Sequence, residues 1–405
     1  MEEWKEYKLK DVTTILGDGL HGTPKYDENG TVFFINGNNL VNGKIEIKDS
    51  TKRVSENEAI KYKKNLNSRT ILVSINGTIG NAAKYRGEAC ILGKSACYFN
   101  VSENFDLNFI YYVVASQQFK NAITQLATGT TIKNVSLETM RNYSFFAPNI
   151  EEQKRISSFL SFLDDKIELN RRINANLEAQ AQALFRSWFV DFEPFRDGPF
   201  VDSELGKIPQ GWKVGNYTDI VEIKGGGTPK TGIQEYWDGT IPFFSPKDVG
   251  ASCFVLDTEK HITAKGLENC NSSLFQTNTV FITARGTVGK VVMTGTEMAM
   301  NQTNYALLGK QNISQYYVYH ITRQLVTRLL KKANGAVFNA ITTRDFTSEQ
   351  IVMPPFSTIR QFSDVVKPIY ENILLNDVQS NRLSALRDTL LPKLMSGEIK
   401  IRETY

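Results

Sequence analysis

The second half of this chain repeats the first, and this duplication limits the folds that the chain can adopt. A tryptophan-lysine pair opens each half, at Trp4 and at Trp212. A Gly-Thr-Pro-Lys segment follows each of them, at residues 22–25 and 227–230. Two copies that repeat after about 207 residues are too few and too long for a solenoid of short repeats. The sequence therefore predicts two homologous domains within one polypeptide.

The composition is typical of a folded protein that does not cross a membrane. Hydrophobic residues make up 41% and aromatic residues 11% of the 405 positions, which is enough for two cores of ordinary size. No apolar run approaches the roughly 18 residues of a transmembrane helix, and the acidic start is unlike a signal peptide. We therefore expect a cytoplasmic protein without a membrane partner. Its four cysteines lack the spacing of a zinc site, and we expect buried thiols.

Each half mixes short β-rich runs with glycine and asparagine turns and one amphipathic helical stretch. In the first half the runs lie at residues 32–35, 70–75, 98–101 and 143–146, and the helical stretch covers 107–126. Their counterparts in the second half lie at 279–283, 291–294 and 315–330. This mixture predicts two α+β domains, which we place at residues 1–150 and 210–355.

After each domain the pattern changes to a heptad repeat, which predicts a long helix. In the first copy the repeat falls on Ile156, Leu163, Asn170, Leu177 and Leu184, and in the second on Phe362, Ile369, Asn376, Leu383 and Leu390. We expect spacer helices at 151–190 and at 356–405, where the second includes a C-terminal tail. A linker, 191–209, follows the first helix. Each helix of about 40 residues would be about 60 Å long, and its apolar face needs a mate, most simply the other helix.

The short linker decides the relative direction of the two helices. An antiparallel coiled coil keeps the linker local, whereas a parallel pair would need almost its whole extended reach. This predicts a pseudo-two-fold symmetric molecule whose domains are separated by the helix pair. Asn170 and Asn376 would meet in the seam and fix its register; alternatively both face solvent. Pro368 should kink or restart the second helix.

The strings that resemble catalytic motifs lack essential features. Residues 93–95 resemble the end of a phosphate-binding loop, but the preceding glycine, Gly87, is one residue too far away. Residues 353–356 resemble the loop of amino-methyltransferases, yet Met353 cannot accept a hydrogen bond from a target amino group. The three histidines have no catalytic partners in the pattern. We therefore expect no catalytic residue, no cofactor and no metal.

Polar loops recur at matching places in the two halves. Asparagine and glutamine can form paired hydrogen bonds with adenine, and lysine and arginine can reach guanine or phosphate, so these loops suit base reading. Any single loop could instead be an ordinary turn. The net charge of +4 is mild, so phosphate contacts must come from local clusters or from a partner. The candidate DNA-binding residues are Lys25, Tyr26, Asn36, Asn38, Asn39, Lys94, Ser95, Thr130, Thr131, Lys133, Lys230, Thr231, Lys247, Asp248, Arg285, Asn301, Gln302 and Asn339.

Three long strings, at residues 183–195, 203–212 and 390–399, resemble the specificity subunits of type I restriction-modification systems. The resemblance covers the whole chain and implies two target-recognition domains, each followed by a spacer helix. It implies a non-enzymatic subunit that binds double-stranded DNA, two methyltransferase (modification) subunits and the restriction/translocase subunits. Each domain would read one half of a bipartite, asymmetric DNA site, and the helices would set the gap between the halves.

Apolar residues persist where the heptad patterns end, and they could present a surface to the modification subunits. These candidate interface residues are Phe185, Trp188, Phe189, Leu391 and Leu394. Alternatively, they cap the core of the helix pair itself. Two other functions stay open. A fused DNA methyltransferase would bind a methyl donor, and a coiled-coil adaptor without a DNA role would not need its polar loops.

Overall fold

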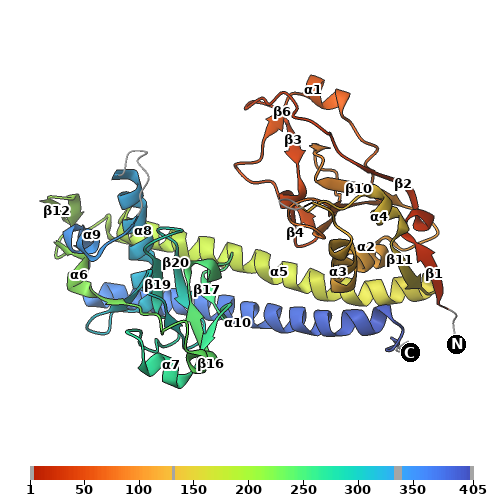
Figure 1. The fold of residues 1–405 in the computed structure, drawn as a ribbon. Helices are drawn as coiled ribbons and strands as arrows, with labels where there is room; N and C mark the ends of the chain where they lie inside the picture. The colour runs from red at the N-terminus through yellow and green to blue at the C-terminus, as the bar shows by residue number, and fades with distance from the viewer. Residues whose placement is uncertain (1–3, 130–132, 333–339, 402–405) are drawn as a thin grey trace. The chain divides into compact units, whose positions relative to one another are not determined.

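The computed structural model describes residues 4–129, 133–332 and 340–401, and the chain divides into two compact units. The first unit consists of residues 1–165 and 383–405, and the second of residues 166–382. The 40-residue helices α5 (Ile150–Phe189) and α10 (Phe356–Met395) each contribute to both units. The expected fold class, two repeated α+β domains with two long helices, is confirmed (Figure 1).

The first unit is built around a four-stranded antiparallel sheet with the strand order β2-β10-β7-β8. These strands are β2 (Thr13–Asp18), β10 (Ala96–Val101), β7 (Thr70–Ser74) and β8 (Ala82–Lys84). A smaller sheet has the order β6-β3-β9, with β6 (Arg53–Val54), β3 (Val32–Ile35) and β9 (Cys90–Leu92). Two strand pairs complete the unit: β1 (Lys5–Lys8) with β11 (Ser144–Ala147), and β4 (Leu40–Val41) with β5 (Lys44–Ile45). The helices of the domain are α1 (Glu56–Lys61), α2 (Leu107–Ala115), α3 (Gln117–Gln125) and α4 (Leu137–Asn142).

The second unit repeats the order of the main sheet with one additional strand, β17, and it repeats the order of the smaller sheet. Its main sheet has the order β15-β22-β19-β20-β17, with β15 (Val221–Gly225), β22 (Asn304–Gly309), β19 (Val280–Thr283), β20 (Val291–Thr294) and β17 (Phe254–Val255). Its smaller sheet has the order β18-β16-β21, with β18 (His261–Ile262), β16 (Trp237–Phe244) and β21 (Ala299–Met300). Further strands pair as β14 (Lys213–Asn216) with β23 (Gln350–Met353) and β12 (Phe200–Ser203) with β13 (Gly206–Pro209). The helices are α6 (Tyr217–Ile220), α7 (Ala264–Glu268), α8 (Gln315–Lys332) and α9 (Thr343–Ser348).

The small sheets show how closely the two copies agree. In the first unit β3 pairs with β9 in parallel, and Phe34 lies opposite Ile91. In the second unit β16 pairs with β21 in parallel, and Phe243 lies opposite Ala299. All four residues are buried. Phe34 and Phe243 therefore occupy equivalent buried positions in the two small sheets.

The helical stretch expected at residues 107–126 is two helices rather than one. Ser116 has an extended backbone, with φ −68° and ψ 150°, and separates α2 from α3. Its hydroxyl oxygen accepts a hydrogen bond from the N–H of Phe119 at 3.1 Å, which caps the start of α3. The apolar pattern continues across the break because both helices pack on the same core, so periodicity alone could not reveal it.

The paired helices run antiparallel within each unit. In the second unit the side-chain nitrogen of Asn170 donates to Gln379 at 2.8 Å, and that of Asn174 donates to Asp377 at 2.8 Å. Contacts therefore move backward along α10 as they move forward along α5. In the first unit Asp164 of α5 forms an ion pair of 2.5 Å with Arg387 of α10. The same unit buries Ile156 and Leu160 of α5 in one core with Leu394 of α10.

The expectation that Pro368 restarts the second long helix is wrong, because α10 continues through this residue. Pro368 lies on the exposed side of the helix. Phe362, Val366 and Tyr370 lie on the opposite side and are fully buried in the core of the second unit. Two of these buried residues precede the proline in the sequence and one follows it. Their burial stabilises the helix and offsets the loss of one backbone hydrogen bond at the proline.

None of the helices in the described part of the chain is both long and apolar enough to cross a lipid bilayer. The four cysteines are free thiols, and Cys97 and Cys253 are buried. Burial raises the pKa of both thiols well above the ordinary value, so they remain protonated at neutral pH.

Candidate nucleic-acid interface

A glycine-rich turn recurs with the same hydrogen bonds in both units. The hydroxyl of Ser74 donates to the carbonyl of Thr78, and the hydroxyl of Thr283 donates to the carbonyl of Thr287. Each hydroxyl also accepts the N–H of the residue seven positions ahead, at 3.2 and 3.0 Å. The φ angles are positive at Gly77 (74°), Gly80 (85°), Gly286 (80°) and Gly289 (82°). Only glycine adopts this geometry easily, which explains why the motif recurs in the sequence.

A groove of about 590 Å³ opens beside this turn in the second unit. Five of the predicted DNA-binding residues line it, namely Thr231, Lys247, Arg285, Asn301 and Gln302. They come from separate loops of the sequence, and the fold of the unit brings them together. Besides Lys247 and Arg285 the lining includes one further cation, Lys260, and one carboxylate, Glu259. The groove therefore has an excess of positive charge, which suits a polyanion.

The side-chain amides of Asn301 and Gln302 lie at this groove. The side-chain oxygen of Asn301 accepts hydrogen bonds from the N–H of Thr303 at 3.0 Å and from the amide of Asn304 at 2.6 Å. The side-chain oxygen of Gln302 accepts the hydroxyl of Thr228. These contacts occupy the oxygens and orient the amide nitrogens as donors for a ligand.

Trp237 and Lys260 belong to the groove although the sequence analysis did not select them. The Lys260 ammonium lies 5.6 Å from the centre of the Trp237 ring, a cation–π contact. The indole N–H donates to the carbonyl of Lys230 at 3.3 Å. Lys52 occupies the place of Lys260 in the first unit, because the N–H of Phe34 donates to the carbonyl of Lys52 as that of Phe243 donates to the carbonyl of Lys260. The Lys52 ammonium lies 6.0 Å from the centre of the Tyr26 ring.

In the first unit the predicted loop residues Asn36 and Ser95 hold each other. The Ser95 hydroxyl donates to the side-chain oxygen of Asn36 at 2.9 Å and accepts the N–H of Gly37 at 2.9 Å. Both side chains are half-buried, whereas the neighbouring Asn38 and Lys94 are exposed. These two hydrogen bonds of Ser95, to Asn36 and Gly37, are called the clasp; they fix the backbone that presents Asn38 and Lys94 to solvent.

Asn39 and Asp248 both hold their own loops; Asn39 is buried, which contradicts the prediction that it faces DNA, whereas Asp248 is half-buried and its DNA contact stays a prediction. Asn39 is 5% exposed, accepts the N–H of Asn36 at 3.0 Å and donates to the carbonyl of Glu46 at 3.0 Å. Asp248 occupies the equivalent position and accepts the N–H of Ser245 at 2.7 Å. Asparagine and aspartate often bond their own backbone in this way.

The remaining predicted residues are dispersed over the two units. Lys25 and Lys230 are exposed, and Tyr26 is 43% exposed with its ring against Phe34. Lys133 lines a second depression, of about 610 Å³, together with Lys120 and the glycine turn of the first unit. Thr130, Thr131 and Asn339 lie outside the described residues.

The apolar residues proposed as an outward interface belong mostly to the cores. Phe185 and Phe189 are 1% and 6% exposed in the second unit, and Leu394 is 2% exposed in the first. The prediction that these three residues present a surface is therefore wrong. Trp188 and Leu391 are half-buried and pack against the same cores. The aromatic residues at the end of α5 anchor that end of the helix in the core of the second unit.

Asn170 lies fully buried between α5 and α10 in the second unit. Its side-chain nitrogen donates to the carbonyl of Asn376 at 3.3 Å and to the hydroxyl of Ser380 at 3.2 Å. The nitrogen of Asn376 in turn donates to the side-chain oxygen of Asn174 at 2.8 Å. The alternative that both asparagines face solvent is wrong for Asn170, and Asn376 is half-buried. The seam is therefore polar at this point.

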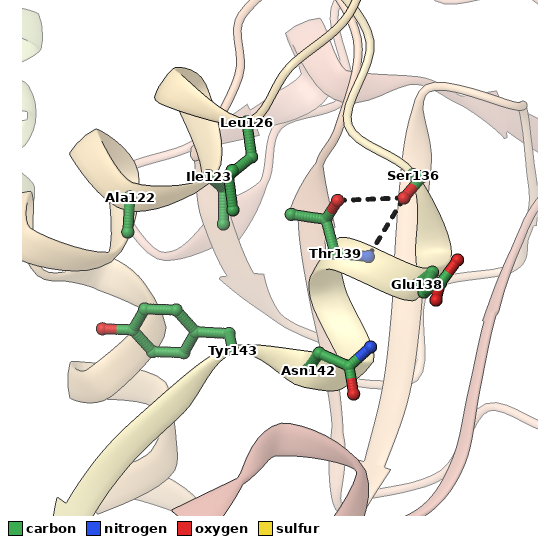
Figure 2. Close-up of a pocket in the computed structure, with 8 residues that line it drawn as sticks. All are labelled: Ala122, Ile123, Leu126, Ser136, Glu138, Thr139, Asn142 and Tyr143. Carbon is green, nitrogen blue, oxygen red and sulfur yellow. Dashed lines mark hydrogen bonds between the residues drawn. The ribbon is translucent and has the colours of Figure 1, made fainter.

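A smaller depression of about 220 Å³ lies between α3 and α4 (Figure 2). Ser136 and Thr139 form the start of α4, where the Thr139 N–H donates to the Ser136 hydroxyl at 3.0 Å. Burial raises the pKa of the Tyr143 phenol to about 12, so this group stays protonated. The lining carries the carboxylate of Glu138 and no cation, and it is therefore less suited to DNA than the groove of the second unit.

No group of three or more histidine, cysteine or carboxylate side chains able to hold a metal is present among the described residues.

The duplicated fold and its loops define a class of protein: a duplicated recognition protein, with polar loops on two related domains and a long helix after each. A family model, "Type I restriction modification DNA specificity domain", matches residues 1–179 and 209–384. The chain belongs to this family, and the resemblance seen in the sequence is confirmed.

Relatives of similar length support this assignment. The chain is 25% identical to the type I restriction enzyme MjaIX specificity subunit of Methanocaldococcus jannaschii, over 99% of this chain and 95% of the relative. It is 24% identical to the HindI specificity subunit of Haemophilus influenzae, over 98% of this chain and 100% of the relative. The crystal structure of a type I restriction-modification S subunit from M. genitalium has the same fold, with a TM-score of 0.59 and 18% identity. That alignment covers 100% of this chain and 97% of the other.

Proposed function

We propose that this chain is the DNA-reading subunit of a type I restriction-modification complex and performs no catalysis itself. Each domain would read one half of a bipartite, asymmetric site in double-stranded DNA. The supporting observation is the duplicated loop frame: the same turns and strand ends recur in both units with different side chains. Two equal frames with unequal side chains suit two half-sites of different sequence.

The groove of the second unit supports this proposal chemically. Its lysines can neutralise phosphates, which supplies affinity without sequence preference. Its Arg285, Asn301 and Gln302 carry hydrogen-bond donors that can distinguish base edges. The proposed domain bounds remain 1–150 and 210–355, with spacer helices at 151–190 and 356–405 and the linker at 191–209. The chain would act in the cytoplasm, where it meets DNA.

The complete complex provides the test of this function. The chain is expressed with its modification subunits in a host without other DNA methylation, and the methylated positions of the genome are sequenced. We expect one motif of two specified halves separated by a fixed number of unspecified base pairs. An undivided motif, or methylation without sequence preference, would contradict the proposal. Binding of the methyl donor S-adenosylmethionine to the isolated chain would favour the alternative of a fused methyltransferase.

We propose that two modification subunits bind along the helices and that restriction subunits join this assembly. The support is a pair of exposed leucines: Leu169 of α5 is 47% exposed and Leu375 of α10 is 65% exposed. Each immediately precedes one of the seam asparagines, Asn170 and Asn376, so the two leucines occupy equivalent positions. Two equivalent apolar positions suit two copies of one partner.

This partner proposal predicts a change in stoichiometry. Replacement of either leucine by lysine (Leu169→Lys or Leu375→Lys) should reduce the purified complex from two modification subunits to one, because a charge would be buried at one interface. The double variant should retain none. Val201→Lys, at an exposed apolar residue outside the helices, serves as the control. Native mass spectrometry measures the ratio, and two bound subunits in the double variant would contradict the proposal.

A further inference from the structure

Asn76 and Arg285 occupy the same position in the two domains, immediately before the glycine turn. Each forms an isolated antiparallel bridge, Asn76 with Asn134 and Arg285 with Ala340. The residues before them, Ile75 and Ala284, are buried and are held identically. The N–H of Ile75 donates to the carbonyl of Ser95 (3.0 Å), and its carbonyl accepts the N–H of Val135 (2.8 Å). In the second domain the N–H of Ala284 donates to the carbonyl of Thr303 (2.9 Å), and its carbonyl accepts the N–H of Ile341 (2.9 Å). The two side chains therefore start from the same backbone frame.

Both side chains belong to the loop regions that we propose as DNA-reading surfaces. Arg285 is exposed and lines the groove of the second unit with Lys247 and Asn301. Asn76 is half-buried beside the clasp of the first unit, since its carbonyl lies 3.4 Å from the place that a Cβ on Gly37 would take. A Cβ built on the glycine that follows either residue, Gly77 or Gly286, meets nothing within 4 Å. A ligand can therefore approach the backbone closely at this position in both domains.

What asparagine and arginine share at this position is paired hydrogen bonding rather than charge. Phosphate contact in both domains would be favoured by a cation at both positions, whereas Asn76 carries no charge and offers phosphate only its amide N–H groups. Arginine presents two parallel donors that match O6 and N7 of guanine. Asparagine presents a donor and an acceptor that match N7 and N6 of adenine. In the groove of the second unit, Lys247 and Lys260 supply positive charge independently of Arg285.

We infer that the residue before the glycine turn is a base-reading position in both domains, at which Asn76 reads an adenine and Arg285 reads a guanine. This inference rests on the proposed function, because it names the bases that the two domains would recognise. It adds Asn76, which the repeated polar loops did not indicate, and it makes the two half-sites differ at equivalent positions. The contacts lie in the major groove, where adenine and guanine present different edges.

Reciprocal substitutions test the inference in the assembled complex of this chain with its modification subunits. Binding is measured to duplexes in which each base pair of the wild-type motif is replaced in turn. For Arg285→Asn we expect the preference for guanine at one position of one half-site to fall about 10- to 100-fold. The other half-site should be unchanged. For Asn76→Arg we expect the converse, with loss of an adenine preference in the opposite half-site.

A matched control and a conservative variant separate base reading from other effects. Lys290→Asn removes an exposed cation next to the same turn but outside the groove, and it should alter no base preference. Arg285→Lys keeps the charge but loses the paired donors, so it should lower discrimination more than affinity. It also replaces Arg285→Asn as the decisive variant if the latter does not fold.

The possible outcomes distinguish this inference from the proposed function. Uniform weakening on every duplex would show that Arg285 contacts phosphate, and an unchanged motif would show that it contacts no base; either overturns the inference. Loss of preference in both half-sites from one substitution would also overturn it. A wild-type complex without any bipartite motif would contradict the proposed function instead.

Discussion

His320 is a neutral histidine sealed in the core of the second unit. It is fully buried, and its ring stacks on Phe185 with 5.0 Å between ring centres. Its two nitrogens lie 3.3 Å from the side-chain oxygen of Gln182 and 2.8 Å from the hydroxyl of Tyr370. A neutral ring satisfies both contacts by donating to Gln182 and accepting from Tyr370. Burial, with a smaller contribution from Arg323, lowers the pKa of His320 to about 3.

This histidine should make the stability of the chain depend on pH. Because the pKa is lower in the folded state than in the unfolded state, the unfolded chain binds the extra proton first. The contribution of His320 to the free energy of unfolding is complete above pH 6.5, the pKa of histidine in the unfolded chain. This contribution is lost as the pH falls from there toward 3. Between pH 7.5 and pH 5 we expect a loss of about 2 kcal/mol in the free energy of unfolding. Urea unfolding at the two pH values measures it.

Two histidine variants isolate this effect from the titration of carboxylates. His320→Gln cannot take up a proton in this range, so its unfolding free energy should change less between the two pH values. His21→Gln serves as the control because the His21 side chain is 59% exposed. It should keep the wild-type pH dependence. An equal slope in wild type and His320→Gln would show that His320 does not carry the effect.

The residue scale also shows where sequence reasoning about the site succeeded and failed. Duplication and base-reading chemistry predicted Lys247, Arg285 and Asn301, which the fold assembles at one groove. The same chemistry misled at the buried Asn39, because short polar side chains hold turns as readily as they contact bases. Only coordinates separate the two roles, since both leave the same local pattern.

At the level of the helices, buried Asn170 in the seam between α5 and α10 lowers the free energy of unfolding. The side-chain oxygen of this buried residue has no hydrogen-bond partner among the described residues. Such an unsatisfied group costs about 1 to 3 kcal/mol. A buried polar residue in a helix seam can nonetheless fix the register, because only one alignment satisfies its donors.

Replacement of this residue by leucine should stabilise the chain. For Asn170→Leu we expect the free energy of unfolding to rise by about 1 to 2 kcal/mol, since the unsatisfied oxygen is removed and apolar area is buried. Arg172→Leu, at an exposed position of the same helix, should change it by less than about 0.5 kcal/mol. Denaturant unfolding of both variants provides the comparison. A destabilised Asn170→Leu would mean that the donors of Asn170 outweigh its oxygen.

Elements with strong periodicity could be predicted, and their interruptions could not. The heptad pattern predicted the long helices, which run over Ile150–Phe189 and Phe356–Met395. The break at Ser116 and the continuity at Pro368 have different causes. At Ser116 the serine hydroxyl caps α3, a local preference that the apolar periodicity hides, whereas at Pro368 tertiary burial overrides the local preference for a break.

At the scale of the whole molecule, we propose that the helices determine the distance between the half-sites. Deletion of one facing heptad from α5 and one from α10 keeps the seam in phase and shortens each helix by about 10 Å. The unspecified gap in the DNA motif should then shrink by about three base pairs, with both half-sites unchanged. Methylome sequencing reads the gap directly.

A second deletion supplies the control for this measurement. Removal of four residues from each helix breaks the heptad phase and should prevent assembly of the complex rather than move the half-sites. An unaltered gap after the heptad deletion would show that the helices do not act as a ruler.

The discontinuous first unit has a consequence for biosynthesis. Residues 166–382, the second unit, form one unbroken stretch of chain, whereas the first unit needs residues 383–405. Its core includes Leu394, and a Cβ on Gly397 would lie 2.9 Å from the indole nitrogen of Trp4. During translation, we therefore expect Ile156 and Leu160 of the first unit to stay partly uncovered until Leu394 of α10 has been made. The second unit, residues 166–382, can therefore complete its core before the first unit does.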